Sequence, residues 1–315
     1  MSKEGDVLEG AVARDKGTRQ TDPVTTTPTG QFRLIVRTFA RDRLALAGLI
    51  LIVVVVGASF GADLLTPYGP NEAHREVGRY APLGTPGHFL GTDGQARDVF
   101  TRLLWGGRVS IPVAVLPVLG ASAASLVIGL MAAFSAGWIG GLAMRILDVM
   151  FAFPPVLLAI AVATILGPGM MNVMLAIGVV SIPYLTRVVF VEAVSVRGSD
   201  YLRAAQVAGT PRRRKLLREV LPNVISPVII YASTGVGGMI VMAAGLSFLG
   251  LGVQPPTPDW GIMTADGRVV LQNLPHIATV PGFLIIAVAL AFNVAGDGLR
   301  DALDPRHRTR TWTAG

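Results

Sequence analysis

The sequence has no cysteine and few charged side chains, with only three lysines and four histidines in 315 residues. Without cysteine there is no disulfide framework, thiolate metal site or thiol nucleophile. Charged residues make up 15% of the chain, against roughly 25% in soluble domains. The histidines are too far apart in the sequence to form a pair with metal-ligand spacing, so we expect them in loops or tails; they are His74, His88, His276 and His307. This composition excludes disulfide-rich and disordered proteins and disfavours a soluble one.

The lysines also exclude one kind of nucleotide site. A phosphate-binding loop ends in Gly-Lys followed by Ser or Thr, but here the residues that follow lysine are Glu4, Gly17 and Leu216. Together with the lack of a thiol nucleophile and of a histidine pair with metal-ligand spacing, this leads us to expect no cofactor in this chain and no catalysis, so that the protein is not an enzyme. If a nucleotide drives its function, another chain binds it.

Apolar residues, in contrast, make up 51% of the sequence. Six apolar runs are each long enough to cross a bilayer, which needs ~20 mostly apolar residues. They cover approximately 44–62, 111–133, 146–166, 172–191, 224–250 and 278–296. We predict an all-α membrane protein with six transmembrane helices over residues 44–296. Pro154 and Pro155 lie inside the third run and predict a kink there, which membrane bundles tolerate.

Two polar tails flank this membrane domain. Residues 1–43 include the Thr- and Pro-rich stretch TDPVTTTPTG, which has little to bury and predicts a largely disordered tail. Residues 297–315 form the second tail. The N-terminal tail, the loops after the second and fourth runs, and the C-terminal tail carry most of the 27 lysines and arginines, whereas the alternate loops carry six. The positive-inside rule places both termini in the cytoplasm.

This distribution also explains the net charge of +7. The excess positive charge lies where anionic lipids of the inner leaflet would meet it, so no nucleic-acid partner is needed to account for it. Inside the runs the ionisable residues are Asp148 and Arg187, both near the ends, and we expect Asp148 to pair with Arg145. Ion-driven transporters usually carry proton-relay or ion-binding residues deep in their helices. The sequence therefore favours transport driven by a partner, with a stand-alone channel or facilitator as the alternative.

The loop Glu192–Asn223 carries clear helix signals. A short helix through Ala208 can be capped by Ser199 or Asp200 and ended by Gly209 in the left-handed conformation. A second, basic helix is predicted to start at Pro211 and to end at Leu221, before Pro222.

Ala204, Ala205 and Ala208 are small neighbours on the first of these helices, so its backbone can dock closely on another protein. A DNA-reading helix pair shows a similar pattern, but membrane spans tether this loop at both ends. A merely solvated hairpin is the third alternative, since charged runs usually form exposed faces.

The same loop resembles the cytoplasmic motif of ABC importer permeases, with Ala204-Ala205, Gly209 and Leu221-Pro222 at the motif positions. Arg203 stands where the motif usually has Glu, and Glu219 stands where this group often has His. Three further blocks resemble the C-type permease subunits of dipeptide, oligopeptide and nickel importers. They are GTDGQARDVFTRLLWGGRVSI (Gly91–Ile111), GLSFLGLGVQPPTPDWGIMTADGR (Gly245–Arg268) and FNVAGDGLRDALDPR (Phe292–Arg306).

The resemblance implies a type I ABC importer permease fold in the cell membrane. It implies as partners a homologous second permease, two cytoplasmic ATPases that hold ATP and Mg²⁺, and an extracytoplasmic substrate-binding protein, with dipeptides or oligopeptides as substrate. The helix that ends at Gly209 would be the coupling helix, docked on one ATPase. Leu221 and Pro222 would belong to the same ATPase-coupling element.

At the other membrane face, Asp93, Arg97, Asp98 and Trp260 are candidates for contact with the binding protein. The three charged residues have an alternative role together with Arg108, as an ion-pair cluster that fixes the loop. Trp260 has the alternative role of anchoring at the membrane interface. In the segment 296–301, after the sixth run, the charges would either end the helix or contact the coupling loop.

Overall fold

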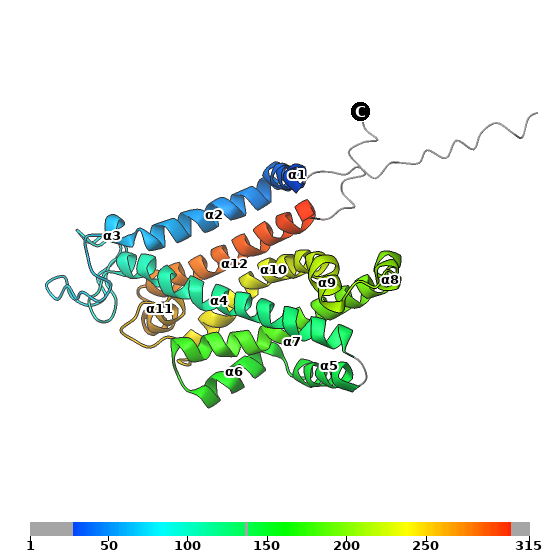
Figure 1. The fold of residues 1–315 in the computed structure, drawn as a ribbon. Coiled ribbons are helices and arrows are strands. Elements are labelled where there is room, and N and C mark those ends of the chain that lie inside the picture. The colour runs from blue at the N-terminus through cyan, green and yellow to red at the C-terminus, as the bar shows by residue number, and fades with distance from the viewer. Residues whose placement is uncertain (1–27, 136–137, 304–315) are drawn as a thin grey trace, which may run out of the picture.

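The computed structural model describes residues 28–135 and 138–303, and this part of the chain forms helices and loops without a β-strand (Figure 1). Its long helices follow the apolar runs, because a segment in lipid must satisfy its backbone hydrogen bonds internally. Five described helices are long and apolar enough to cross a membrane, or six spans if a bent pair is counted as one. The five are α2 (Arg43–Phe60), α4 (Val99–Phe134), α7 (Met170–Arg197), α10 (Leu221–Phe248) and α12 (His276–Leu303). The predicted all-α membrane protein is confirmed.

The bent pair consists of α5 (Trp138–Phe151) and α6 (Pro155–Leu166), which meet at 95°. Proline lacks the amide donor that a helix interior needs, and it pushes the preceding residue out of the α region. Two successive prolines therefore end α5 and start α6. The prediction of a kinked single helix over 146–166 is wrong: the helix before the break starts at Trp138, and the kink is a complete break.

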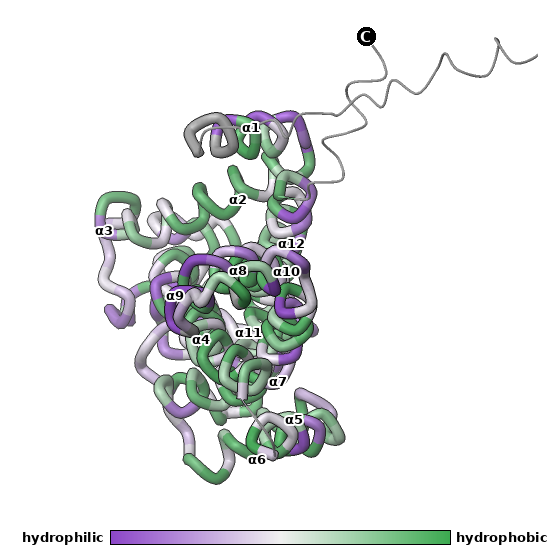
Figure 2. The backbone as a smooth tube through the Cα atoms, turned by 45° about the vertical axis from the view of Figure 1, so that its right-hand side comes forward, coloured by the Kyte–Doolittle hydropathy of each residue, from purple (hydrophilic) through white to green (hydrophobic). Residues whose placement is uncertain are grey.

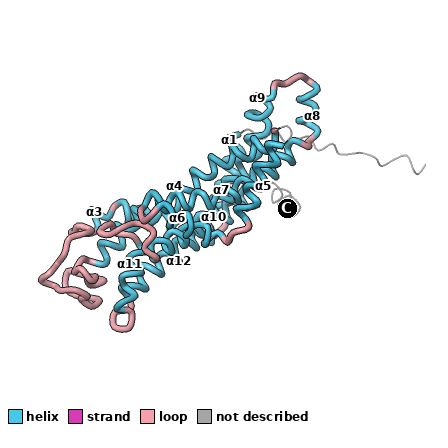
Figure 3. The backbone as a smooth tube through the Cα atoms, turned by 90° about the horizontal axis from the view of Figure 1, so that it is seen from below, coloured by secondary structure: helices cyan, strands magenta, loops and turns pink. Residues whose placement is uncertain are grey.

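The shorter helices lie mainly at the two ends of the bundle. They are α1 (Pro28–Arg41), α3 (Ala62–Leu65), α8 (Asp200–Val207), α9 (Arg212–Lys215) and α11 (Trp260–Gly267), with a π turn at Leu216–Val220 and a 3-10 turn at Arg268–Val270. Figures 1 and 3 place α1, α8 and α9 at one end, and α3 and α11 at the other. Hydrophobic residues follow the long helices between these ends, and hydrophilic residues gather on α9 and on part of α1 (Figure 2).

Helix α4 packs against α7 and α10 in the centre of the bundle, and α12 and α2 follow on the outside (Figure 1). Hydroxyl groups join α4 and α7: Thr186 Oγ1 donates to Ser125 Oγ at 3.0 Å. Small residues bring α2 onto α12, where a Cβ on Gly48 would lie 2.8 Å from the carbonyl oxygen of Ala291. Close backbone approach at small residues is how helices associate in lipid, which gives them little hydrophobic driving force.

Three expectations need correction. Residues 28–41 of the tail predicted to be disordered form helix α1, whereas residues 1–27 lie outside the described part of the chain. Asp148 pairs with Arg187 at 3.2 Å rather than with Arg145, because α5 packs beside α7. Helix α12 continues to Leu303, so the charged segment 296–301 lies within the helix and does not end it.

Candidate functional site

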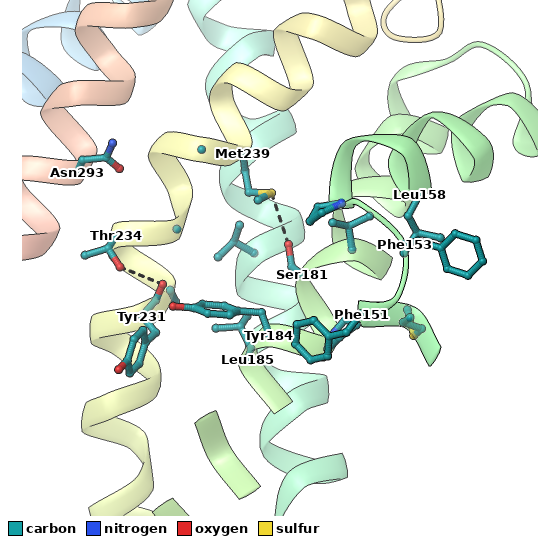
Figure 4. Close-up of a pocket in the computed structure, with 18 residues that line it drawn as sticks. Phe151, Phe153, Leu158, Ser181, Tyr184, Leu185, Tyr231, Thr234, Met239 and Asn293 are labelled. Carbon is teal, nitrogen blue, oxygen red and sulfur yellow. Dashed lines mark hydrogen bonds between the residues drawn. The ribbon is translucent and has the colours of Figure 1, made fainter. Parts of the chain in front are cut away.

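A pocket of about 500 Å³ opens where the α5–α6 break faces α7 and α10 (Figure 4). Phe151 is the last residue of α5 and Phe153 lies in the break, and both side chains line this space. Tyr184 enters from α7 and Tyr231 from α10. Four aromatic rings from three parts of the chain therefore line one cavity, which lies midway along the bundle.

The two tyrosines close one side of the pocket. Their ring centroids lie 5.8 Å apart with an interplanar angle of 84°, the edge-to-face arrangement that aromatic pairs prefer. In Figure 4 Phe151 lies at the same level, below Met239 and Asn293. Because α7 ends and α10 begins at the end that carries α8 and α9, the tyrosine pair lies on that side of the pocket.

The remaining polar groups in the pocket are neutral. Ser181 Oγ donates to the carbonyl oxygen of Ile177 at 2.8 Å and lies 3.7 Å from Met239 Sδ. Thr234 and Asn293 add a hydroxyl and an amide from α10 and α12. The described residues that line this pocket include no Asp, Glu, Lys, Arg or His. The pocket thus offers aromatic surface and a few neutral hydrogen-bonding groups.

The loop predicted to dock on a partner is built around Gly209, which follows α8. Its φ is +74°, in the left-handed region where glycine meets no steric penalty. The amide of Thr210 donates to the carbonyl oxygen of Ala205 at 3.1 Å, so the helix ends in a Schellman motif. A Cβ on Gly209 would meet no atom within 4 Å among the described residues. Backbone conformation rather than crowding therefore requires glycine here.

Helix α8 leaves the small residues Ala204 and Ala208 exposed, and Val207 is 90% exposed. Ala205 is half-buried, and Leu202 packs into a core cluster with Val220 and its neighbours. One side of α8 is thus fixed to its own chain, and the side with the small residues remains open.

The second predicted helix does not end before Pro222. Helix α9, the π turn and α10 follow one another without a break, and the helix continues from residue 212 to Phe248. Pro222 is tolerated because it lies in the first turn of α10. The π turn directly before it already interrupts the regular hydrogen-bond pattern of the helix, so the missing proline amide breaks no further regular bond. Leu221 and Pro222 therefore begin a membrane helix. Asn223 Nδ2, one residue further on, donates to the carbonyl oxygen of Glu219 at 2.6 Å.

At the opposite end, four of the five charged residues of the Gly91–Ile111 block are buried, and Arg108 is half-buried. Asp93 Oδ2 lies 2.7 Å from Arg97 Nη2 and 3.4 Å from Arg102 Nε, and its other oxygen accepts two backbone amides. Arg102 also donates to the carbonyl oxygen of Pro70 at 2.8 Å. These contacts fasten the long loop between α3 and α4 to the first turn of α4.

Asp98 belongs to a neighbouring group rather than to that ion-pair cluster. Its Oδ2 accepts the amide of Thr101 at 2.7 Å and caps α4, while Oδ1 lies 2.9 Å from His88 Nδ1. The His88 ring stacks on Tyr68, with centroids 4.9 Å apart, and is buried. Arg108 pairs with Asp63 of α3, so its predicted place in the cluster is wrong.

Trp260 is 1% exposed, so it does not anchor at the membrane surface. Its Nε1 donates to the carbonyl oxygen of Leu103 at 2.8 Å, and its ring fills the space beside Gly106 and Gly107 of α4.

Asp259, the residue before Trp260, caps α11 and accepts a hydrogen bond from Ser110 Oγ at 2.7 Å. Burial raises the pKa of this carboxyl group, and the hydrogen bonds that it accepts oppose that rise.

Taken together, the structure places the predicted site residues at the two ends of the bundle. Asp93, Arg97, Asp98 and Trp260 all make internal contacts and are buried. The central pocket was missed by the sequence analysis. Its one sequence signal is the Pro154-Pro155 pair, whereas nothing marks Tyr184 or Tyr231 within their apolar runs.

The class of protein defined by this bundle, its neutral central pocket and its exposed loop helix is the membrane component of a transporter. Residues 125–309 match the family described as the binding-protein-dependent transport system inner membrane component, and residues 30–82 match the N-terminal TM domain of oligopeptide transport permease C. The chain belongs to this permease family; it is a non-catalytic, membrane-embedded transport subunit with the type I importer permease fold.

Relatives match along most of their length. The chain is 40% identical over 269 residues to the dipeptide transport system permease protein DppC of Alkalihalophilus pseudofirmus, covering 85% of this chain and 88% of that relative. It is 38% identical over 295 residues to the glutathione transport system permease protein GsiD of Pectobacterium atrosepticum, covering 94% of each. It is 38% identical over 274 residues to the di/tripeptide transport system permease protein DppC of Pseudomonas aeruginosa, covering 86% and 90%.

Proposed function

We propose that this chain is one of two permease subunits of an ATP-driven importer for peptides. The observation that carries the proposal is the exposed small-residue side of α8, ended by a left-handed Gly209, in a chain whose close relatives are named as dipeptide, di/tripeptide and glutathione permeases. A homologous permease, two ATPases that bind ATP and Mg²⁺, and an extracytoplasmic binding protein complete the transporter. Energy enters through the ATPases, which accounts for the scarcity of ionisable residues in the membrane.

The chain is best tested in its assembled complex. Tagged protein expressed with its chromosomal neighbours should co-purify with ATPase subunits, and added binding protein with a dipeptide should stimulate ATP hydrolysis in nanodiscs. A chain that elutes alone, under conditions that keep a control transporter together, would instead support the stand-alone channel. Glutathione belongs in the substrate screen because it is itself a short peptide with a free carboxylate.

The orientation is part of the proposal: α1, α8 and α9 face the cytoplasm, and α3 and α11 face outward. The chain has no cysteine, so single cysteines can be introduced without background. In intact cells a membrane-impermeant maleimide should label Arg75→Cys, in the outer loop, and should label Arg213→Cys only after permeabilisation. Both side chains are exposed, so accessibility to solvent is matched. The opposite pattern would invert the topology.

We further propose that the central pocket forms this chain's half of the substrate path, with the Tyr184–Tyr231 pair on its cytoplasmic side. Support comes from its position midway along the bundle, its neutral lining and its volume of about 500 Å³, which falls in the usual range for ligand sites. Because the lining is neutral, its aromatic faces and hydroxyls can accommodate varied peptide side chains without selecting for either sign of charge. Selectivity then rests mainly with the binding protein.

Replacing Tyr184 or Tyr231 with alanine should impair transport more than assembly. Removing one ring opens the cytoplasmic side of the pocket and loses an aromatic pair worth about 0.5–1.5 kcal/mol. We expect dipeptide uptake into proteoliposomes to fall about two- to thirteenfold, the range that this energy corresponds to, with ATP hydrolysis still stimulated by the binding protein. Phe283→Ala is the matched control, because this α12 ring is exposed on the bundle surface. Unchanged uptake in both tyrosine variants would exclude the pair from the path.

A further inference from the structure

Helix α1 has a strongly amphipathic sequence, PTGQFRLIVRTFAR. Arg33, Arg37 and Arg41 recur every four residues, a spacing that aligns side chains along one side of a helix. All three are exposed. Ile35 and Phe39 lie on the opposite side and are half-buried. The helix therefore presents a row of guanidinium groups on one side and apolar groups on the other.

The helix lies across the end of the bundle rather than along it (Figures 1 and 2). The chain turns sharply at Asp42, whose Oδ1 accepts the amides of Leu44 and Ala45 at 2.9 and 3.1 Å and so starts α2 in a new direction. Phe39 reaches the end of α12, where a Cβ on Gly298 would lie 3.4 Å from its Cε2. Leu44, just after the turn, is 73% exposed and begins the apolar surface of α2.

No carboxylate neutralises the arginine row within the described residues. None of the three guanidinium groups has an Asp or Glu oxygen within 4 Å there. The neighbouring Asp42 is engaged in capping α2, and Asp301 near the end of α12 makes no ion pair with the row. Three positive charges without an acidic partner among residues 28–135 and 138–303 thus lie on a helix that crosses the bundle directly before its first apolar span.

We propose that α1 is an interfacial helix that binds anionic phospholipid headgroups through Arg33, Arg37 and Arg41. An amphipathic helix lies in the membrane plane when its apolar side enters the headgroup boundary and its basic side meets the lipid phosphates. Each basic residue near an anionic surface adds a favourable electrostatic term that salt screens. Charge complementarity and the exposed apolar surface of α2 beside the helix favour a lipid surface over a protein partner.

The experiment compares lipid binding by the full transporter complex and its variants. Complexes with R33Q/R37Q/R41Q in this chain are reconstituted in nanodiscs that contain phosphatidylcholine with a fraction of spin-labelled phosphatidylglycerol, and the immobilised fraction of the label is measured. We expect the relative affinity for phosphatidylglycerol to fall at least about tenfold, since three interfacial charges are lost. The matched control R75Q/R79Q/R268Q removes three exposed arginines from the opposite end and should leave that affinity unchanged.

Two further measurements make the result specific. R33K/R37K/R41K should restore most of the binding, because lysine keeps the charge; failure to restore it would indicate a geometric role rather than surface electrostatics. Glycerol 3-phosphate in solution should not compete, and full competition would overturn the assignment to membrane lipid. Wild-type affinity in the glutamine variant, or loss of the ATPases from that variant's complex, would also overturn it. Lipid binding is read without any transported substrate, so the result does not depend on the proposed import function.

Discussion

Replacing Gly209 with valine should uncouple transport from ATP hydrolysis while leaving membrane insertion intact. At φ of +74° a β-branched side chain collides with its own backbone, and forcing an ordinary residue into this region costs about 1–2 kcal/mol. The chain after α8 would relax to negative φ, which would re-aim α8 relative to α9. Binding-protein-stimulated ATP hydrolysis should uncouple from uptake, with peptide uptake at least about tenfold lower, since about 1.4 kcal/mol corresponds to a tenfold change.

The loop supplies its own controls for this result. Gly209→Asn should keep most of the uptake, because asparagine tolerates the left-handed region. Gly198→Ala should have little effect: Gly198 ends α7 with φ of −77°, and an added Cβ would make only an ordinary contact, 3.5 Å from the carbonyl oxygen of Ser195. Full transport by the Gly209→Val protein would exclude this loop as the coupling element.

Replacing Trp260 with alanine is expected to destabilise the folded protein strongly. Truncation of a fully buried tryptophan typically costs about 3–5 kcal/mol, because it leaves a cavity and removes apolar contacts. Here the substitution would also leave the carbonyl of Leu103 without its indole donor, and it would empty the space beside Gly106 and Gly107. Helix α11 would therefore lose its main packing contact with α4. Denaturation of the purified complex in nanodiscs, followed by circular dichroism, measures the loss.

A graded pair of variants separates packing from hydrogen bonding. Trp260→Phe keeps most of the ring volume and should lose about 1 kcal/mol for the missing hydrogen bond, together with a small packing cost. Trp138→Ala is the matched control, since this tryptophan of α5 is 74% exposed and should change stability little. If Trp260→Ala and Trp138→Ala proteins unfold at the same midpoint, the buried joint between α4 and α11 does not stabilise the fold.

The sequence allowed the membrane helices to be predicted because lipid imposes a simple rule on them, namely a long apolar run. The end of α8 could also be predicted, since the left-handed conformation at Gly209 follows from local backbone sterics. The helix boundary at Pro222 could not be predicted in the same way. Proline is compatible both with the end of one helix and with the first turn of the next, and only the π turn before it decides between them.

The pocket and the outer ion pairs depend on residues that are distant in the sequence. Tyr184 and Tyr231 are 47 positions apart and meet only because α7 packs on α10. Arg102 contacts Pro70 across a loop whose course no local pattern defines. The depth of burial at Asp93 and Trp260 likewise follows from tertiary packing, so the sequence supported both an exposed and a buried role for these residues.

The continuous helix from residue 212 to Phe248 connects the loop at one end of the bundle directly to the wall of the central pocket. Tyr231 lies 19 residues beyond Arg212 on this helix, or about 28 Å at 1.5 Å per residue. A helix of this kind can carry a tilt at its basic end toward the pocket wall, and the helix can bend along that path at the π turn and at Pro227. A displacement of the loop at Gly209 would therefore reach Tyr231 only to the extent that these two positions hold the helix straight, so substitutions that stiffen or loosen them should tune how far the pocket wall moves.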